Sequence, residues 1–101
     1  MEKNLEAVLA VNSIPIELNA FAEQFLARTV VGAVSSLRGA RDIRDLELSL
    51  EEGDVGIIVN GDQLTLTPFP RDIIARTITG LVSSLKGVGE IDSVKVGVKA
   101  R

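Results

Sequence analysis

The stretch RTVVGAVSSLRG occupies positions 28–39, and the stretch RTITGLVSSLKG occupies positions 76–87. The same phrase therefore returns after a spacing of 48 residues. A fixed internal period is typical of a chain built from a repeated supersecondary unit. The period predicts that the fold consists of two copies of one unit.

The repeat extends well beyond this phrase. When the chain is shifted by 48 residues, positions 7–50 align with positions 55–98 without a gap, and 14 of these 44 positions are identical. The sequence EEGD at residues 51–54 joins the two segments as a turn. A chain of 101 residues is long enough for one hydrophobic core. We therefore expect a single domain over residues 1–101.

The chain lacks most of the residue types that commonly take part in catalysis or bind metals. The chain has no Cys, no His and no Tyr, so the usual general bases, covalent nucleophiles and soft metal ligands are missing. The repeated Ser-Ser pairs have no His to activate them. The EEGD turn lacks the alternating oxygen ligands of an EF-hand loop. The sequence predicts that the protein is not an enzyme and has neither a cofactor nor a metal site.

Charge and hydropathy also exclude classes of partner. The net charge is −3, and the 11 Lys and Arg residues are scattered, so no basic stripe is available for phosphate groups. No apolar run approaches the roughly 20 residues of a membrane span, and the first residues do not have the pattern of a signal peptide. We expect a soluble, cytoplasmic protein that binds neither nucleic acid nor a membrane.

Each repeat opens with a predicted β-hairpin. The segments AVLAVNSIPIEL (7–18) and VGIIVNGDQLTL (55–66) each contain two short strands around a two-residue turn. The second turn is Asn60-Gly61, a pair that suits the positive φ values of a type I′ hairpin. In this register the apolar residues share one face of the hairpin. The expected pairs are Leu9 with Ile16, Ala7 with Leu18, Ile57 with Leu64, and Val55 with Leu66.

A helix is predicted after each hairpin. Asn19 and Thr67 fall at equivalent positions, and both residue types cap helix N-termini. Gly39 and Gly87 are also equivalent, and glycine commonly closes a helix at its C-terminal end. The predicted helices are residues 20–38 and residues 68–86.

A further strand is predicted after each helix, because apolar and polar residues largely alternate over residues 43–50 and 91–98. The repeat is thus a β-β-α-β unit. Each element has one apolar side, which favours one layer of strands and one of helices. We expect an α+β fold with pseudo-two-fold symmetry, in which a six-stranded, mostly antiparallel sheet carries both helices on one face.

The order of the strands is less constrained. With the six strands numbered along the chain, we expect the order 2-1-3-6-4-5. The strands at 43–50 and 91–98 then meet at the pseudo-two-fold axis, and each lies beside the first strand of its own repeat. The alternative pairs the strand at 43–50 with the strand at 55–59 through the EEGD turn.

The repeated phrase has a predicted packing role. The stripe expected to face the sheet comprises Leu26, Val30, Ala33 and Leu37 in the first helix and Ile74, Ile78, Leu81 and Leu85 in the second. Beside it lie Gly32 and Gly80, and a glycine inside a helix costs about 1 kcal/mol relative to alanine. We therefore expect the helices to approach each other along a seam at these glycines, with the Phe rings covering its ends.

The same phrase carries a second candidate role. Arg28 with Ser35, and Arg76 with Ser83, are expected beside the helix seam, where they would hold an anion. A small-ligand binding domain of this kind is the alternative functional prediction.

The outer face of the sheet has no element left to cover it. Small and apolar residues are mixed with charges on this face. The predicted interaction surface comprises Val8, Ala10, Ile58, Thr65, Glu47, Lys95 and Lys99. The leading functional prediction is therefore a small protein-interaction or assembly module that binds another protein or itself as a homodimer, through this face or through an edge strand.

Overall fold

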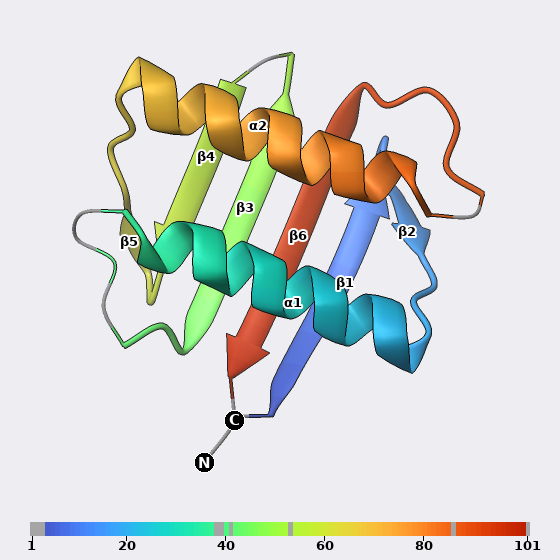
Figure 1. Cartoon of the computed structure of the whole chain (residues 1–101), viewed down its shortest axis with the longest axis horizontal. Coiled ribbons are helices and arrows are strands. Elements are labelled where there is room, and N and C mark those ends of the chain that lie inside the picture. Colours follow the sequence, from blue (N-terminus) through green and yellow to red (C-terminus); the bar gives the residue numbers. More distant parts are fainter. Residues whose placement is uncertain (1–3, 38–39, 41, 53, 86, 101) are drawn as a thin grey trace.

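The computed structural model of the chain describes residues 4–37, 40, 42–52, 54–85 and 87–100. These residues form six strands and two helices, whose arrangement is drawn in Figure 1. The strands are β1 (Leu5–Val11), β2 (Ile14–Ile16), β3 (Asp45–Glu51), β4 (Asp54–Val59), β5 (Asp62–Gln63) and β6 (Ser93–Ala100), and the helices are α1 (Ala20–Ser35) and α2 (Pro68–Ser83).

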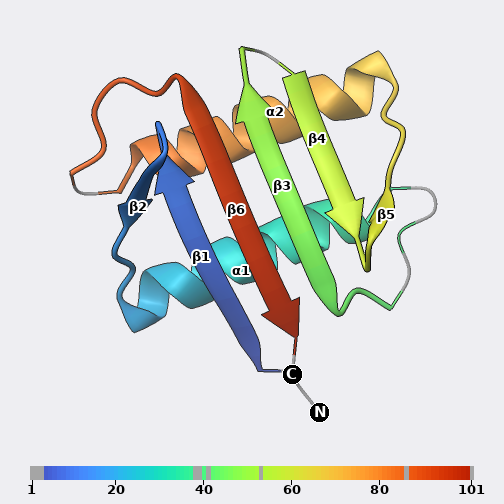
Figure 2. The same cartoon turned by 180° about the vertical axis from the view of Figure 1, so that it is seen from behind.

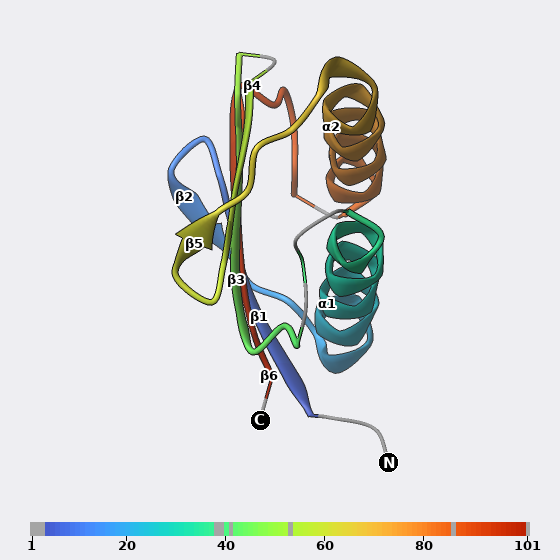
Figure 3. The ribbon, with the colours of Figure 1, turned by 90° about the vertical axis from the view of Figure 1, so that its left-hand side faces the viewer.

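The strands form one sheet in which every pairing is antiparallel. Both helices cover the same face of this sheet, so the molecule has two layers (Figure 3). The predicted α+β class, the six-stranded antiparallel sheet and the two helices are thus confirmed.

The strand order is β2-β1-β6-β3-β4-β5 (Figure 2), and the expected order 2-1-3-6-4-5 is wrong. β6 pairs with β1 along Leu5–Val11 and separates β1 from β3. The alternative pairing of β3 with β4 is correct, as is the expected contact between β3 and β6. The reason is local, because Glu51 and Asp54 are paired and the short connection between them places β4 directly beside β3.

The predicted hairpin turns are confirmed. Asn12 and Ser13 have φ values of 53° and 66°, and Asn60 and Gly61 have 51° and 88°. Asparagine and glycine tolerate this left-handed conformation better than other residues. Leu9 pairs with Ile16 as expected, and the backbone N–H of Leu64 donates to the carbonyl of Ile57 at 2.9 Å. The other two expected pairs lie beyond the ends of β2 and β5.

Both helices begin where the sequence predicts. The side chain of Asn19 accepts a hydrogen bond from the backbone N–H of Ala22 at 2.7 Å. Thr67 also occupies the N-cap, but its side chain makes no capping bond. The equivalent of Ala22 is Pro70, which has no N–H to donate.

Both helices end earlier than predicted, at Ser35 and Ser83 instead of residues 38 and 86. The last turn is tightened, since the N–H of Ser36 donates to the carbonyl of Ala33, three residues back. Gly87 has a φ of 83° but lies in the loop after α2, so it does not close the helix. Gly39 lies outside the described residues.

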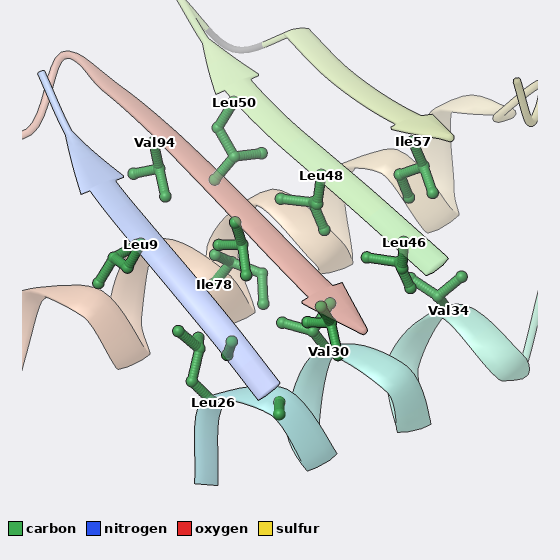
Figure 4. Packing of buried hydrophobic residues seen from close by; sticks show 14 of the residues in the cluster. Leu9, Leu26, Val30, Val34, Leu46, Leu48, Leu50, Ile57, Ile78 and Val94 are labelled. Carbon is green, nitrogen blue, oxygen red and sulfur yellow. The ribbon is translucent and has the colours of Figure 1, made fainter. Parts of the chain in front are cut away.

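The core lies between the sheet and the helices and is aliphatic (Figure 4). Of the predicted helix stripe, Leu26, Val30, Ile74 and Ile78 are buried. Ala33, Leu37, Leu81 and Leu85 are only half-buried, and Ala27, Val34 and Val82 take the buried places.

Two asparagines tie the turns of the hairpins to distant parts of the chain. The side-chain oxygen of Asn12 accepts from the N–H groups of Asp92 and Ser93 at 2.7 and 2.9 Å. The side-chain oxygen of Asn60 accepts from the N–H groups of Arg44 and Asp45 at 2.8 and 3.0 Å. Each asparagine therefore fixes the start of a central strand, β6 for Asn12 and β3 for Asn60.

Candidate functional site

The outward surface of the two helices carries every aromatic residue of the chain. Phe21, Phe25 and Phe69 are 76%, 52% and 72% exposed, and none of them enters the core. Ile73, which is equivalent to Phe25 in the repeat, is 47% exposed. Large apolar side chains grouped on an exposed surface mark sites of interaction. We call the surface formed by Phe21, Phe25, Gly32, Phe69, Ile73 and Gly80 the helix face.

The two helical glycines lie on this face and not in a seam. Both Gly32 and Gly80 are exposed, and a Cβ atom added to either would meet no atom within 4 Å. The expected close approach of the helices at these glycines is therefore wrong. The physical reason is that both glycines lie on the side of their helix that points away from the sheet, while Leu26 and Val30 point into the core.

A groove of about 730 Å³ opens where the helices do lie side by side. Phe21, Ala22 and Phe25 from the start of α1 line one side, and Leu81 near the end of α2 and Leu85 just after it line the other. A hollow of about 320 Å³ lies between the opposite ends, where Leu37 follows α1 and Pro70 lies in the first turn of α2. The helices therefore run antiparallel beside each other, as Figure 1 also shows.

The residues of the predicted anion site are not brought together across the helices. Arg28 and Ser35 line a cavity of about 300 Å³ with Asp42, and no residue of α2 takes part in it. Arg76 and Ser83 belong to the other helix and are exposed. The carboxylate of Asp42 in the same cavity makes it less suited to an anion.

The repeated serines are bonded to their own backbone. The hydroxyls of Ser35 and Ser36 donate to the carbonyl of Gly32 at 3.0 and 3.1 Å. Ser83 and Ser84 donate in the same way to the carbonyl of Gly80 at 2.9 and 3.1 Å. Such local bonds compete with the helix and favour its end. They give the Ser-Ser pairs a structural role in ending the helices.

The opposite surface of the molecule is the sheet face, and none of the described helices covers it (Figure 2). A groove of about 680 Å³ runs over this face, with β2 and β5 displaced outward at its two sides (Figure 3). Five members of the predicted interaction surface line this groove, namely Val8, Ala10, Glu47, Ile58 and Lys95. Thr65 instead lines the hollow between the helix ends, and Lys99 lies outside the groove.

The charges of the sheet face follow the strand pairing. Lys99 on β6 is paired with Glu6 on β1 and with Asp45 on β3. Lys95 is paired with two small neutral residues, Ala10 and Ser49. Opposite charges therefore adjoin directly at Lys99 and only diagonally at Lys95.

Among the described residues, no group of three acidic side chains is placed to hold a metal ion. In the EEGD turn, Glu51 ends β3 and Asp54 opens β4, while Gly53 lies outside the described residues. In the same described part of the chain, neither helix has the length and apolar character needed to cross a membrane.

The helix face is the feature that sequence reasoning missed. A signal for it was present, since Phe21 and Phe25 lie on the side of the helical wheel opposite Leu26 and Val30.

No protein family, curated protein or solved structure matches this chain.

Proposed function

We propose that this chain is a small protein-interaction module that binds its partner on the helix face. The observation that carries this proposal is the exposure of all three Phe residues of the chain on that one surface. Exposed aromatic side chains supply large apolar contact area at low cost in side-chain entropy, and they are enriched at protein interfaces.

The other candidate surfaces are less suited to binding a partner. The edge strand β2 has three residues and contains Pro15, and the edge strand β5 has two residues. Short edges and proline discourage strand addition. The exposed edge of β1 is also occupied, because Glu23 accepts from the N–H of Ala7 at 3.0 Å and Gln24 donates to the carbonyl of Leu5 at 2.7 Å.

The sheet face is the second candidate surface. Val8 is 71% exposed and Ile58 is 38% exposed on it. Its groove is flanked by the displaced strands β2 and β5, which would hold a second flat sheet away from its floor. Its floor also carries charges such as Glu47 and Lys95. The helix face carries four exposed large apolar side chains, whereas the sheet face carries Val8 and Ile58.

We also propose that the fold is a duplicated β-β-α-β unit with pseudo-two-fold symmetry. The first residues of α1 and α2 are 48 residues apart, and so are their last residues, which is the spacing of the sequence repeat. The strand order reads the same from either edge when equivalent strands are exchanged. Exchanging segments 20–36 and 68–84 tests the proposal, because each should fold in the place of the other. Loss of cooperative unfolding in the exchanged chain would count against it.

Site-specific photo-crosslinking in cells tests the binding surface. A photoreactive phenylalanine analogue at position 21 or 69 should give covalent adducts with a protein partner. Position 8 is the matched control, since Val8 on the sheet face is as exposed as Phe69, at 71% and 72%. Adducts at position 8 alone would show that the partner binds the sheet face instead. Adducts at none of the three positions would contradict an interaction function.

A further inference from the structure

We infer that the partner of the helix face is a second copy of this chain, packed helix face to helix face about a two-fold axis. The axis lies in the plane between the copies and runs across the helices. This inference rests on the proposed function, because it names the partner for the same surface.

The first step is the distribution of bulk on the helix face. Each helix is bulky in its first half, at Phe21 and Phe25 in α1 and at Phe69 and Ile73 in α2. Each is small in its second half, where the glycine and two serines of the repeated phrase lie. Because the helices run antiparallel, the bulky half of one lies beside the small half of the other.

The second step is symmetry. In a two-fold dimer the same surface is used twice, so it must be complementary to itself. A two-fold axis across the helices lays α1 antiparallel on the partner's α1, and α2 antiparallel on the partner's α2. The bulky half of every helix then faces the small half of its counterpart. In this arrangement Phe69 lies over Gly80 and Ser84 of the partner subunit, at the margin of its larger groove.

The third step is the cost of the glycines. Gly32 and Gly80 have no positive φ that would require glycine, and no atom of the described residues approaches the Cβ position of either. Each glycine lowers the stability of its helix by about 1 kcal/mol relative to alanine. Among the residues that the structure describes, no contact at the Cβ position offsets this cost. A ring of a second copy that lies directly on the helix backbone would need the absence of a side chain there.

The fourth step is area. The face of the molecule measures 34 by 33 Å, which leaves room for the roughly 800 Å² per partner that a stable interface buries. Phe21, Phe25, Phe69 and Ile73 would place apolar side chains near both ends of this contact. Homodimer interfaces are more apolar than an ordinary protein surface, which suits these four exposed side chains.

Charge sets how this dimer should respond to salt. Arg76 is exposed near the middle of α2, so the proposed axis brings it close to the partner's Arg76. Like charges that face each other across an interface oppose association, and salt screens them. Dimer formation should therefore strengthen as salt is raised, whereas an association held by opposite charges would weaken.

Sedimentation equilibrium on the purified chain tests the inference. The wild type should reach twice its monomer mass of 10.8 kDa as the concentration rises. Phe69→Asp and Gly80→Leu should each weaken the dimer at least about tenfold, which is the effect of losing a central contact. Circular dichroism should show that Gly80→Leu keeps the fold, since its side chain meets open space. Val8→Asp on the sheet face is the control and should leave the dissociation constant unchanged.

Three results would overturn the inference. A wild type that stays monomeric up to about 1 mM would exclude a second copy, because that limit corresponds to only about 4 kcal/mol of binding free energy. The proposed function would then still stand if crosslinks at positions 21 and 69 reached a different protein. A dimer lost in Val8→Asp but kept in Phe69→Asp would place the contact on the sheet face. A dimer that survives both Phe69→Asp and Gly80→Leu would also reject the helix face.

Disulfide trapping tests the direction of the axis, since the chain has no Cys of its own. A mixture of the single variants Phe25→Cys and Gly32→Cys should give the mixed disulfide under oxidation, because the two positions face each other across α1 and the partner's α1. Mixing Phe25→Cys with Gly80→Cys is the matched comparison. A mixed disulfide in the second mixture only would show that the axis runs along the helices instead.

Discussion

Asn12 and Ser93 exchange two hydrogen bonds although they are 81 residues apart in the sequence. The N–H of Asn12 donates to the carbonyl of Ser93 at 2.9 Å, and the N–H of Ser93 donates to the side-chain oxygen of Asn12 at 2.9 Å. A third bond runs from the side-chain amide of Asn12 to the carbonyl of Glu90 at 2.8 Å. One residue in a hairpin turn therefore fixes the start of the central strand β6.

Replacing Asn12 should lower stability more than its partial exposure suggests. Asn12→Ala loses the side-chain bonds and places alanine at a φ of 53°, so we expect a loss of about 1–3 kcal/mol in the free energy of unfolding. Asn12→Gly separates the two causes, because glycine accepts this φ but makes no side-chain bond. Urea denaturation measures both variants. Equal stability of Asn12→Ala and wild type would show that the bonds contribute nothing.

The helical glycines should be replaceable by alanine with a gain in stability. Gly80→Ala is expected to raise the free energy of unfolding by about 0.5–1 kcal/mol, because alanine is the better helix former and its Cβ meets no atom. Gly87→Ala is the opposite control and should destabilise, since Gly87 has a φ of 83°. Denaturation at low protein concentration measures the monomer. A destabilised Gly80→Ala would reveal a contact within the chain.

The two N-caps should respond unequally to the same substitution. Asn19→Ala removes a capping bond of 2.7 Å and should cost about 1 kcal/mol. Thr67→Ala should cost less, because Thr67 makes no capping bond. Thermal unfolding of the two variants side by side checks the difference. A larger loss of stability for Thr67→Ala than for Asn19→Ala would show that Thr67 is the stronger N-cap.

The lysines of β6 should also differ. Lys99→Glu would place an acid between Glu6 and Asp45, whereas Lys95→Glu would face Ala10 and Ser49. We expect Lys99→Glu to destabilise by about 0.2–1 kcal/mol more than Lys95→Glu. The gap should narrow in high salt, which screens exposed charges. If both reversals cost the same in low salt, direct cross-strand pairing does not govern the charge effect.

Much of the fold could be predicted because its signals are local. The turn at Asn60-Gly61, the caps at Asn19 and Thr67 and the alternation in β3 each report on neighbouring residues. Strand order is not a local property, because the alternation of β6 is the same beside β1 or beside β4. Only the short turn between Glu51 and Asp54 constrained it, since it joins β3 to β4.

The candidate site was harder to predict, because the residue type alone does not show whether a Phe is exposed or buried. Phe21 lies on the side of α1 opposite the buried Leu26 and Val30, but an apolar residue is ordinarily assigned to a contact within the chain. The expected contact at Gly32 has a different basis, because a glycine inside a helix lowers the stability of that helix and suggests close packing within the chain. Only the position of each helix relative to the sheet shows that both residues face outward.

The interleaving of β6 between β1 and β3 sets an order of events during synthesis. β1, β2, β3, β4, β5 and both helices leave the ribosome before β6, yet β6 occupies a central place in the sheet. Until Ser93–Ala100 emerges, no strand joins the pair β1–β2 to the group β3–β4–β5. The apolar faces of these two parts of the sheet then have only the helices to cover them. Pairing across such sequence distances is slow. The nascent chain thus holds a gap in its sheet until β6 arrives, and exposed apolar surface needs protection by a chaperone most during that interval.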